Sequence, residues 1–453
     1  MRKAVLILYF SVLGYYILGQ ETDSLPVRWG NAFYFNLSVG ESTEFLGKNI
    51  RLISMENNGC LVDVDGVREN LIVARRTLPV VVNGIRMFVA DNRNVEKLTT
   101  DEANPHVHDA LTKDVLLCLS DSLKPILDSG KFAFPVDRSD GFEWTKAENS
   151  HMWAYLKPTR SHEGIDINLH RARGQEIDAI VSIEDGIVHW KTDVNSNESC
   201  LYIESISSPG IYYIYQHLNR KTVSLKEGDR VRKGQFLAYI WGDGKWGHLH
   251  FAVKGKEGVT DYKNRYTALL NCFPQLYELW YGDLEPHTPV RTTGHYHFAK
   301  PYWLYGNEQG LNGYDEILGY GWDLGSWCTA YTVETSAAEK ENSPDQSAVL
   351  RKTIHKSTGM PATNPNNFYD FEVKVPDSDY CVNVNVGNMY GLTWQRIEIE
   401  GVDAGVYELD AGELKWTGEK RVKVSDGKLT VRVYLKDDVT EAGIFEVYFT
   451  IAG

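Results

Sequence analysis

The sequence has few cysteines, no excess of basic charge and only one long apolar run. Its six cysteines lie far apart among 453 residues, and no two form a C-x-x-C pair. This excludes a structural zinc ribbon and a thioredoxin-type redox motif. The net charge is −14, so the chain lacks the basic surface typical of proteins that bind nucleic acid. Beyond the first twenty residues, no apolar stretch is long enough to span a bilayer.

The first twenty residues predict a secretory signal peptide. Arg2 and Lys3 precede an apolar run over residues 4–18, and the sequence then turns polar. The run lacks a clean small-x-small cleavage site, so an uncleaved N-terminal anchor remains the alternative. In both cases we expect a secreted, periplasmic or cell-envelope protein. Export would allow Cys328 to pair with Cys381, with buried free thiols as the other possibility.

Composition and length predict a mostly β protein of three domains. The chain holds 26 Tyr, 12 Trp and 39 Gly, which favours strands joined by many turns. About 150 residues per domain is the usual size. We expect an N-terminal β-rich domain over residues 21–130, a central antiparallel β-sheet domain over 131–290 and a C-terminal β-sandwich over 291–453. The linker-like composition of residues 285–289 places the second boundary.

Local patterns support this division. Asn83-Gly84 stands between two β-prone runs, and this dipeptide favours a type I′ hairpin turn because both of its residues accept positive φ. Apolar and polar residues alternate over 380–386 and over 429–435, as in strands with one buried face. We expect one short helix within residues 262–279.

Three short segments carry side chains that can bind a metal or transfer a proton. They are His162 and Asp166 in H-E-G-I-D, His217 in Y-Q-H-L, and His248 and His250 in G-H-L-H-F. All lie in apolar, strand-like surroundings. Two histidines and an aspartate are a ligand set for a catalytic zinc ion, which lowers the pKa of its bound water to roughly 7. A single histidine in a strand is usually structural, but five such residues together predict one zinc site.

The spacing sets conditions on the backbone. In a strand, His248 and His250 point to the same side with Cα atoms about 7 Å apart. His162 and Asp166 would be about 13 Å apart on a flat strand, too far for one zinc ion, so a bend is required. Gly164 lies between them and permits that bend. Spacing alone leaves open which histidines bind the metal and which transfer protons.

These segments resemble the M23 (lysostaphin/LytM-type) family of zinc metallopeptidases. That family carries H-x-x-x-D, then a strand ending in Y-x-H-L, then H-x-H, and all three occur here in that order. The connecting residues 174–188 and 225–235 also resemble the family pattern, as does the entry Phe134-Pro135-Val136. The resemblance covers residues 130–255, about a quarter of the chain.

The resemblance implies one Zn²⁺ ion per chain, held by His162, Asp166 and His250. His217 and His248 would flank the zinc-activated water as proton acceptor and as stabiliser of the oxyanion. The implied reaction is hydrolysis of a peptide bond in the peptide part of bacterial cell walls, at glycyl bonds or at D-amino-acid cross-links.

Two departures from the family pattern leave the substrate open. Trp246 stands in K-W-G-H-L-H, where the family often has T-G-P-H-L-H, and it could narrow the groove. Residues 145–160, which precede His162, also differ from common members. Neither departure removes a predicted ligand, so the active-site set is intact.

Other histidines are expected to be structural or exposed rather than metal ligands. They are His106, His108, His170 and His189, together with the His295-x-His297 pair, which repeats the pattern of His248 and His250 without an H-x-x-x-D partner.

The C-terminal region more weakly resembles malectin-like and related carbohydrate-binding β-sandwiches. The resemblance rests on residues 319–323, 368–371, 375–380 and 424–429. Exposed Trp or Tyr side chains could stack on sugar rings, or the aromatic residues could fill the sandwich core instead.

The sequence therefore predicts an exported zinc-dependent endopeptidase that acts on peptidoglycan or another extracytoplasmic peptide. The alternative is a non-catalytic envelope protein that binds glycan or partner proteins. A polysaccharide-active enzyme is a third possibility, although the last domain has no evident pair of catalytic carboxylates.

Overall fold

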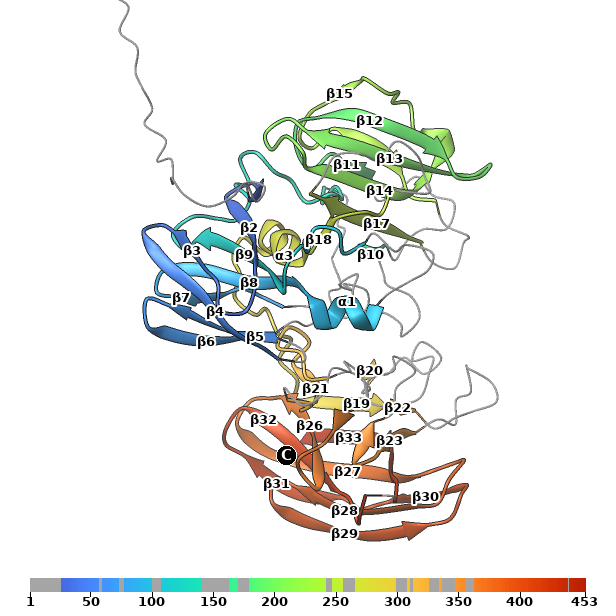
Figure 1. Cartoon of the computed structure of the whole chain (residues 1–453). Helices are drawn as coiled ribbons and strands as arrows, with labels where there is room; N and C mark the ends of the chain where they lie inside the picture. Colours follow the sequence, from blue (N-terminus) through green and yellow to red (C-terminus); the bar gives the residue numbers. More distant parts are fainter. Residues whose placement is uncertain are drawn as a thin grey trace, which may run out of the picture.

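The computed structural model describes residues 26–56, 59–72, 77–99, 107–139, 163–169, 179–241, 247–255, 265–298, 308–309, 313–325, 334–335, 347–354, 362–438 and 440–453. The predicted signal segment lies outside these residues. The described chain is mostly β, as predicted (Figure 1). None of its helices is long and apolar enough to cross a membrane.

The N-terminal region forms two antiparallel sheets. In the larger one, the strand order is β1-β2-β9-β8-β7, with β1 (Val27–Trp29), β2 (Ala32–Leu37), β7 (Val80–Val82), β8 (Ile85–Asn92) and β9 (Val115–Asp121). The other contains β3 (Ser42–Phe45), β4 (Lys48–Glu56), β5 (Gly59–Val64) and β6 (Val67–Ile72). Asn83 and Gly84 join β7 to β8 with φ of 53° and 79°, which confirms the predicted hairpin. Helix α1 (Arg93–Thr99) follows β8.

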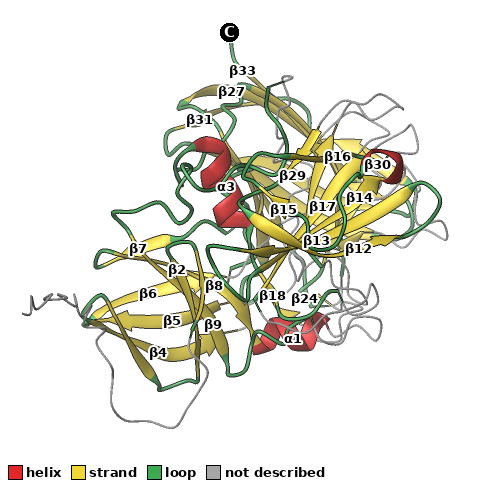
Figure 2. Cartoon of the chain, turned by 90° about the horizontal axis from the view of Figure 1, so that it is seen from above, coloured by secondary structure: helices red, strands yellow, loops and turns green. Residues whose placement is uncertain are grey.

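The central region is built on one antiparallel sheet. Its strand order is β10-β17-β14-β13-β12-β15, and β18 pairs with β17. Figure 2 shows β12, β13, β14 and β17 of this sheet. The strands are β10 (Ile165–Leu169), β12 (Gly186–Asp193), β13 (Glu198–Ser205), β14 (Tyr212–Asn219), β15 (Arg230–Val231), β17 (Gly247–Lys254) and β18 (Leu269–Leu270). A small second sheet pairs β11 (Ala179–Val181) with β16 (Phe236–Tyr239). The short 3-10 helix η2 (Arg220–Thr222) follows β14.

The predicted helix is present as α3 (Phe273–Tyr281), which starts later than the segment 262–279 suggested. Leu269 and Leu270 pair with β17 before the helix begins. Pro274 lies in the first helical turn, where its missing N–H costs no hydrogen bond. The helix ends at Gly282, whose φ of 85° and N–H bond to the carbonyl of Glu278 form a left-handed cap.

The C-terminal region is a β-sandwich, as predicted, and it lies below the other two regions in Figure 1. One sheet has the order β20-β19-β33-β23-β22, with β27 pairing with β33, β31 and β30; the other has the order β21-β26-β32-β28-β29. The predicted alternating segments form β27 and β32. The bounds are β19 (Thr293–His297), β20 (Glu308–Gln309), β21 (Tyr320–Trp322), β22 (Glu334–Thr335), β23 (Ala348–Leu350), β24 (Thr353–Ile354), β25 (Ala362–Thr363), β26 (Phe368–Lys374), β27 (Ser378–Asn388), β28 (Thr393–Ile399), β29 (Val402–Leu409), β30 (Glu413–Trp416), β31 (Lys420–Val424), β32 (Lys428–Tyr434) and β33 (Ala442–Ile451).

The aromatic residues that suggested a sugar-binding sandwich fill its core. Tyr320, Trp322, Tyr369 and Phe371 are at most 5% exposed. Trp322 and Phe371 pack with ring centroids 5.2 Å apart. These four side chains therefore stabilise the sandwich by burial and are not available to stack on a ligand.

Among the described cysteines, Cys118, Cys200, Cys272 and Cys381 are free thiols. Cys328, the partner expected for Cys381, lies outside the described residues.

The central sheet is buried on both faces. Along β17, Leu249, Phe251 and Val253 belong to one hydrophobic core, which we call the first core. Ala252 belongs to another, the second core, because successive side chains of a strand point to opposite faces. Both cores also contain residues of the N-terminal sheets, such as Trp29 in the first core. The N-terminal and central regions therefore pack as one body.

Polar contacts fix this packing. The indole N–H of Trp29 donates to the hydroxyl of Tyr213 at 2.9 Å, and the Tyr213 hydroxyl donates to the buried Glu184 carboxylate. The carboxylate of Glu278 on α3 accepts the backbone N–H groups of Ile126 and Leu127 at 2.7 and 3.2 Å. These contacts hold α3 and the central sheet against the segment that leads out of β9.

We predict that Glu278→Ala lowers the free energy of unfolding by about 2–6 kcal/mol, because it leaves two buried N–H groups without an acceptor at about 1–3 kcal/mol each. Glu285→Ala is the control, since the Glu285 side chain is exposed and such substitutions change stability by about 0.5 kcal/mol or less. Urea denaturation followed by tryptophan fluorescence measures both. Equal effects of the two substitutions would contradict the role of Glu278.

Candidate active site

The pairing of β10 with β17 brings two of the predicted metal ligands together. Asp166 lies opposite His250 in the antiparallel register, and Asn168 lies opposite His248. An Asp166 Oδ1 atom is 3.0 Å from Nδ1 of His250 and 3.4 Å from Nε2 of His248. All three side chains are on the face of the sheet that carries the second core. His162, the third predicted ligand, lies outside the described residues.

Gly164 is packed against the imidazole of His250. A Cβ atom on Gly164 would lie 2.5 Å from the carbonyl oxygen of Phe251 and 2.8 Å from Nε2 of His250. No side chain fits at that distance, so glycine is required for the chain to approach the site just before β10. The sequence identified this residue as the one that permits a bend; the structure adds that its backbone forms part of the wall beside His250.

A β-bulge carries His217 to the same site. Ser199 pairs with Leu218 and Leu201 pairs with Tyr215, so three steps along β14 oppose two steps along β13. His217 lies within this bulge and has a left-handed backbone conformation, with φ of 63°. Regular alternation would turn His217 toward the first core with Tyr213 and Tyr215. The bulge instead places its ring 4.6 Å from the ring of His248 and 6.1 Å from that of His250.

The side chain of Glu198 contacts the imidazole ring of His217. Oε1 of Glu198 is 2.7 Å from Nδ1 of His217, and the Glu198 carboxylate also accepts a bond of 3.1 Å from Asn195 Nδ2. Burial acts to raise the pKa of Glu198, but the hydrogen bond and charge of His217, with smaller contributions from Asn195 and Arg265, leave this pKa below its ordinary value. Glu198 is therefore ionised at neutral pH.

On the buried side of the site, Tyr266 packs against the imidazole ring of His250. The ring of Tyr266 lies 5.3 Å from that of His250. Its hydroxyl donates to Oε1 of Gln216, which also accepts from Nε of Arg265 at 3.2 Å. Gln216 is the residue opposite His250 on β14. Burial raises the pKa of Tyr266 well above its ordinary value, so its hydroxyl stays protonated.

The site becomes more open from His250 toward His217. The exposed fraction of the side chain is 5% for His250, 12% for His248, 18% for Asp166 and 25% for His217. The interior end suits a fixed ligand, and the outer end suits groups that meet a substrate.

The two described donors, Asp166 Oδ1 and His250 Nδ1, lie at a separation that suits a zinc ion. Two ligands of one tetrahedral zinc lie about 3.4 Å apart, and Asp166 Oδ1 and His250 Nδ1 are within about 0.5 Å of that separation. Within the described residues, no group of three or more His, Cys, Asp or Glu could hold a metal ion. With His162 outside them, they contain two of the three predicted ligands.

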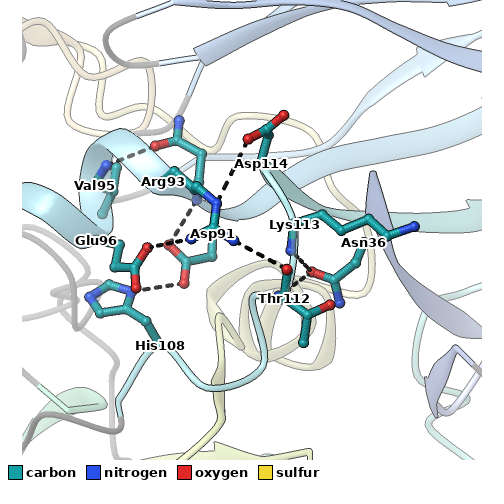
Figure 3. Close-up of polar contacts among 10 residues, drawn as sticks. Asn36, Asp91, Arg93, Val95, Glu96, His108, Thr112, Lys113 and Asp114 are labelled. Atoms are coloured by element: carbon teal, nitrogen blue, oxygen red, sulfur yellow. Dashed lines mark hydrogen bonds and ion pairs between the residues drawn. The ribbon is translucent and has the colours of Figure 1, made fainter. Parts of the chain in front are cut away.

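Three of the other histidines, His108, His189 and His295, have carboxylate partners away from this site. Nδ1 of the buried His108 is 2.8 Å from Oδ2 of Asp91 (Figure 3). His189 lies 3.7 Å from Glu204, and Nε2 of His295 lies 2.6 Å from Oε2 of Glu446. His297 is buried against the ring of Phe445. His106 and His170 lie outside the described residues.

Comparison with known families identifies the class of this site. The model of peptidase family M23 matches residues 160–262, which include the five predicted site residues. The chain therefore carries an M23 family peptidase domain, as the sequence motifs predicted.

Several solved structures are locally similar to this chain. YxiM from Bacillus subtilis is 17% identical, with 36% of this chain and 40% of that chain covered and a TM-score of 0.26. The lytM protein from Ruminococcus gnavus is 23% identical, covering 32% and 60%, with a TM-score of 0.25. The catalytic domain of lysostaphin from Staphylococcus simulans is 20% identical, covering 27% and 86%, with a TM-score of 0.21. The chain thus spans well under two thirds of YxiM. No curated protein sequence matches it.

Sequence reasoning missed Glu198 and Tyr266. Glu198 has the same parity along β13 as the buried Cys200 and Tyr202, so alternation could have placed it on the site face of the sheet. Its contact with His217 depends on the bulge in β14, which no local sequence pattern predicts. Tyr266 lies beyond the last motif and reaches His250 through the fold of the chain after β17.

We predict that Gly164→Ala lowers the free energy of unfolding by about 1–3 kcal/mol, the usual cost of overpacking a filled site. The added methyl group would displace either the carbonyl of Phe251 or the ring of His250. Thermal unfolding of the full chain measures the change. A variant as stable as the parent, with His250 in the same position in its crystal structure, would contradict the close packing.

Proposed function

We propose that this protein is an exported zinc-dependent endopeptidase that hydrolyses peptide bonds in peptidoglycan cross-links or stem peptides. The observation that carries the proposal is the convergence of Asp166, His217, His248 and His250 on one face of the central sheet. The match of residues 160–262 to peptidase family M23 supports it.

The residues divide into metal ligands and groups that act on the substrate. His162, Asp166 and His250 would hold one zinc ion, in keeping with the burial of His250 and its distance from Asp166. A bound zinc ion lowers the pKa of water and polarises a carbonyl group. His217 lies at the more open end of the site, and its ring is 4.6 Å from that of His248. We assign to His217 the acceptance of a proton from the attacking water and to His248 a hydrogen bond to the developing oxyanion.

The alternative is a non-catalytic envelope protein in which this domain binds glycan or a partner. The intact set of metal-binding and proton-transfer residues favours the enzyme.

We expect the purified full chain to contain about one zinc ion and to release amino groups from peptidoglycan. Asp166→Ala should lose the zinc and lower the rate at least about 100-fold, since a ligated metal contributes several kcal/mol to the transition state. Asp403→Ala, an exposed position of the C-terminal sandwich, should change neither. Metal analysis, with intact mass to locate the mature N-terminus, accompanies the assay.

The outcomes separate the candidate functions. Zinc without release of amino groups from any peptidoglycan would exclude the proposed substrate. Absence of zinc in the parent would exclude the catalytic proposal and leave the binding module.

The division into domains at residues 130 and 290 and the role of the last domain are also proposals. We propose that the C-terminal sandwich binds glycan and thereby brings the peptidase to the cell wall. Because its core aromatic residues are buried, the ring that stacks on a sugar must be an exposed one. Trp416 on β30 is 43% exposed.

We predict that the full chain sediments with insoluble cell-wall polysaccharide and that Trp416→Ala reduces the affinity about 5–100-fold, equivalent to roughly 1–3 kcal/mol of ring stacking. Trp416→Tyr retains an aromatic face and should bind with intermediate affinity. Equal binding of all three proteins would remove Trp416 from the proposal, and no binding by the parent would remove the glycan-binding role.

A further inference from the structure

His217 is held in a conformation that its own backbone does not favour. Its φ of 63° lies in the left-handed region, which costs a residue other than glycine about 1–2 kcal/mol. The bulge in β14 supplies this conformation, and without it the side chain would face the first core. The bulge accounts for the direction of the side chain, but it leaves the rotation and tautomer of the imidazole ring undetermined.

Glu198 is placed to determine both. It is 5% exposed, and it faces the site because Cys200 and Tyr202, two and four residues on, face the second core. One carboxylate oxygen lies 2.7 Å from Nδ1 of His217, and the other accepts from Asn195. The backbone N–H of Glu198 donates to Oδ1 of Asn195 at 3.0 Å. Glu198 is thus held to Asn195 through its backbone N–H as well as through its carboxylate.

An ionised carboxylate can only accept hydrogen bonds, so the proton between these groups belongs to Nδ1 of His217. Neutral His217 then carries its lone pair on Nε2. In His248 the other ring nitrogen lies near a carboxylate, because its Nε2 is 3.4 Å from Oδ1 of Asp166. The two histidines therefore face carboxylates through different ring nitrogens, Nδ1 in His217 and Nε2 in His248, which suits them to different roles.

We propose that Glu198 is a positioning residue: by accepting the Nδ1–H of His217, it fixes the ring and the tautomer that leave Nε2 as the proton acceptor. The proposal rests on the function proposed above. It assigns to this site a carboxylate from the β12–β13 hairpin that contacts His217. The competing explanation is that Glu198 only stabilises the hairpin through Asn195.

Glu198→Gln in the full-length, zinc-loaded protein tests the two explanations. A glutamine amide can donate to Nδ1 and so favour the opposite tautomer. We expect kcat to fall about 10–100-fold, with KM changed less than roughly twofold and zinc content unchanged. Glu204→Gln is the matched control, because Glu204 lies on the same strand and contacts a histidine, His189, away from the site. It should leave kcat unchanged.

Two further measurements report on the imidazole ring of His217 and do not depend on the stability of the β12–β13 hairpin. Removal of the side chain in Glu198→Ala leaves a space for a small carboxylate, so added formate should restore part of kcat in this variant and not in His217→Ala. Nitrogen-15 NMR of labelled histidine, with the signal assigned by His217→Gln, should show the Nδ1–H tautomer in the parent and a shift toward Nε2–H in Glu198→Gln.

The results distinguish failure of this inference from failure of the proposed function. A parent with zinc that hydrolyses no peptide would exclude the function, and the tautomer measurement would still test Glu198. An active parent whose Glu198→Gln variant retains kcat and the same tautomer would overturn the positioning role. Loss of kcat in Glu198→Ala without rescue and without a change of tautomer in Glu198→Gln would also overturn it, in favour of a structural role.

Discussion

The antiparallel register between β10 and β17 is the constraint on which the site depends. It sets Asp166 directly opposite His250, and a slip of one residue would turn one of them to the other face of the sheet. The register is held because Ile165 and Ile167 on β10 and Leu249 and Phe251 on β17 are buried in the first core. The polar residues of the site therefore keep their positions through the apolar residues between them.

The bulge in β14 is the second constraint, and it works against regular strand geometry. Tyr213, Tyr215 and Leu218 all reach the first core only because one extra residue separates the last two. That extra residue lets His217 leave the core and join His248 and His250. The strain of its left-handed backbone is offset by the hydrogen bonds of the neighbouring strands and by the contact with Glu198.

The N-terminal sheets belong to the physical support of the site. Their apolar residues enter both cores that sandwich the central sheet, and the carbonyl of Val107 accepts the N–H of Leu269 in β18, the strand that pairs with β17. Hydrophobic burial of this kind joins the N-terminal and central regions, so the central sheet is stabilised by residues far from its own motifs.

The sequence by itself determined the β class, the Asn83-Gly84 hairpin, the alternating strands of the sandwich and the M23 motifs. These follow from local causes, namely turn chemistry, strand periodicity and ligand type. Tertiary structure decided the rest. It turned His217 to the site through a bulge, brought Glu198 behind it, placed Tyr266 against His250 and buried the aromatic residues of the sandwich. Those outcomes depend on register and packing between segments distant in the chain, which no local pattern contains.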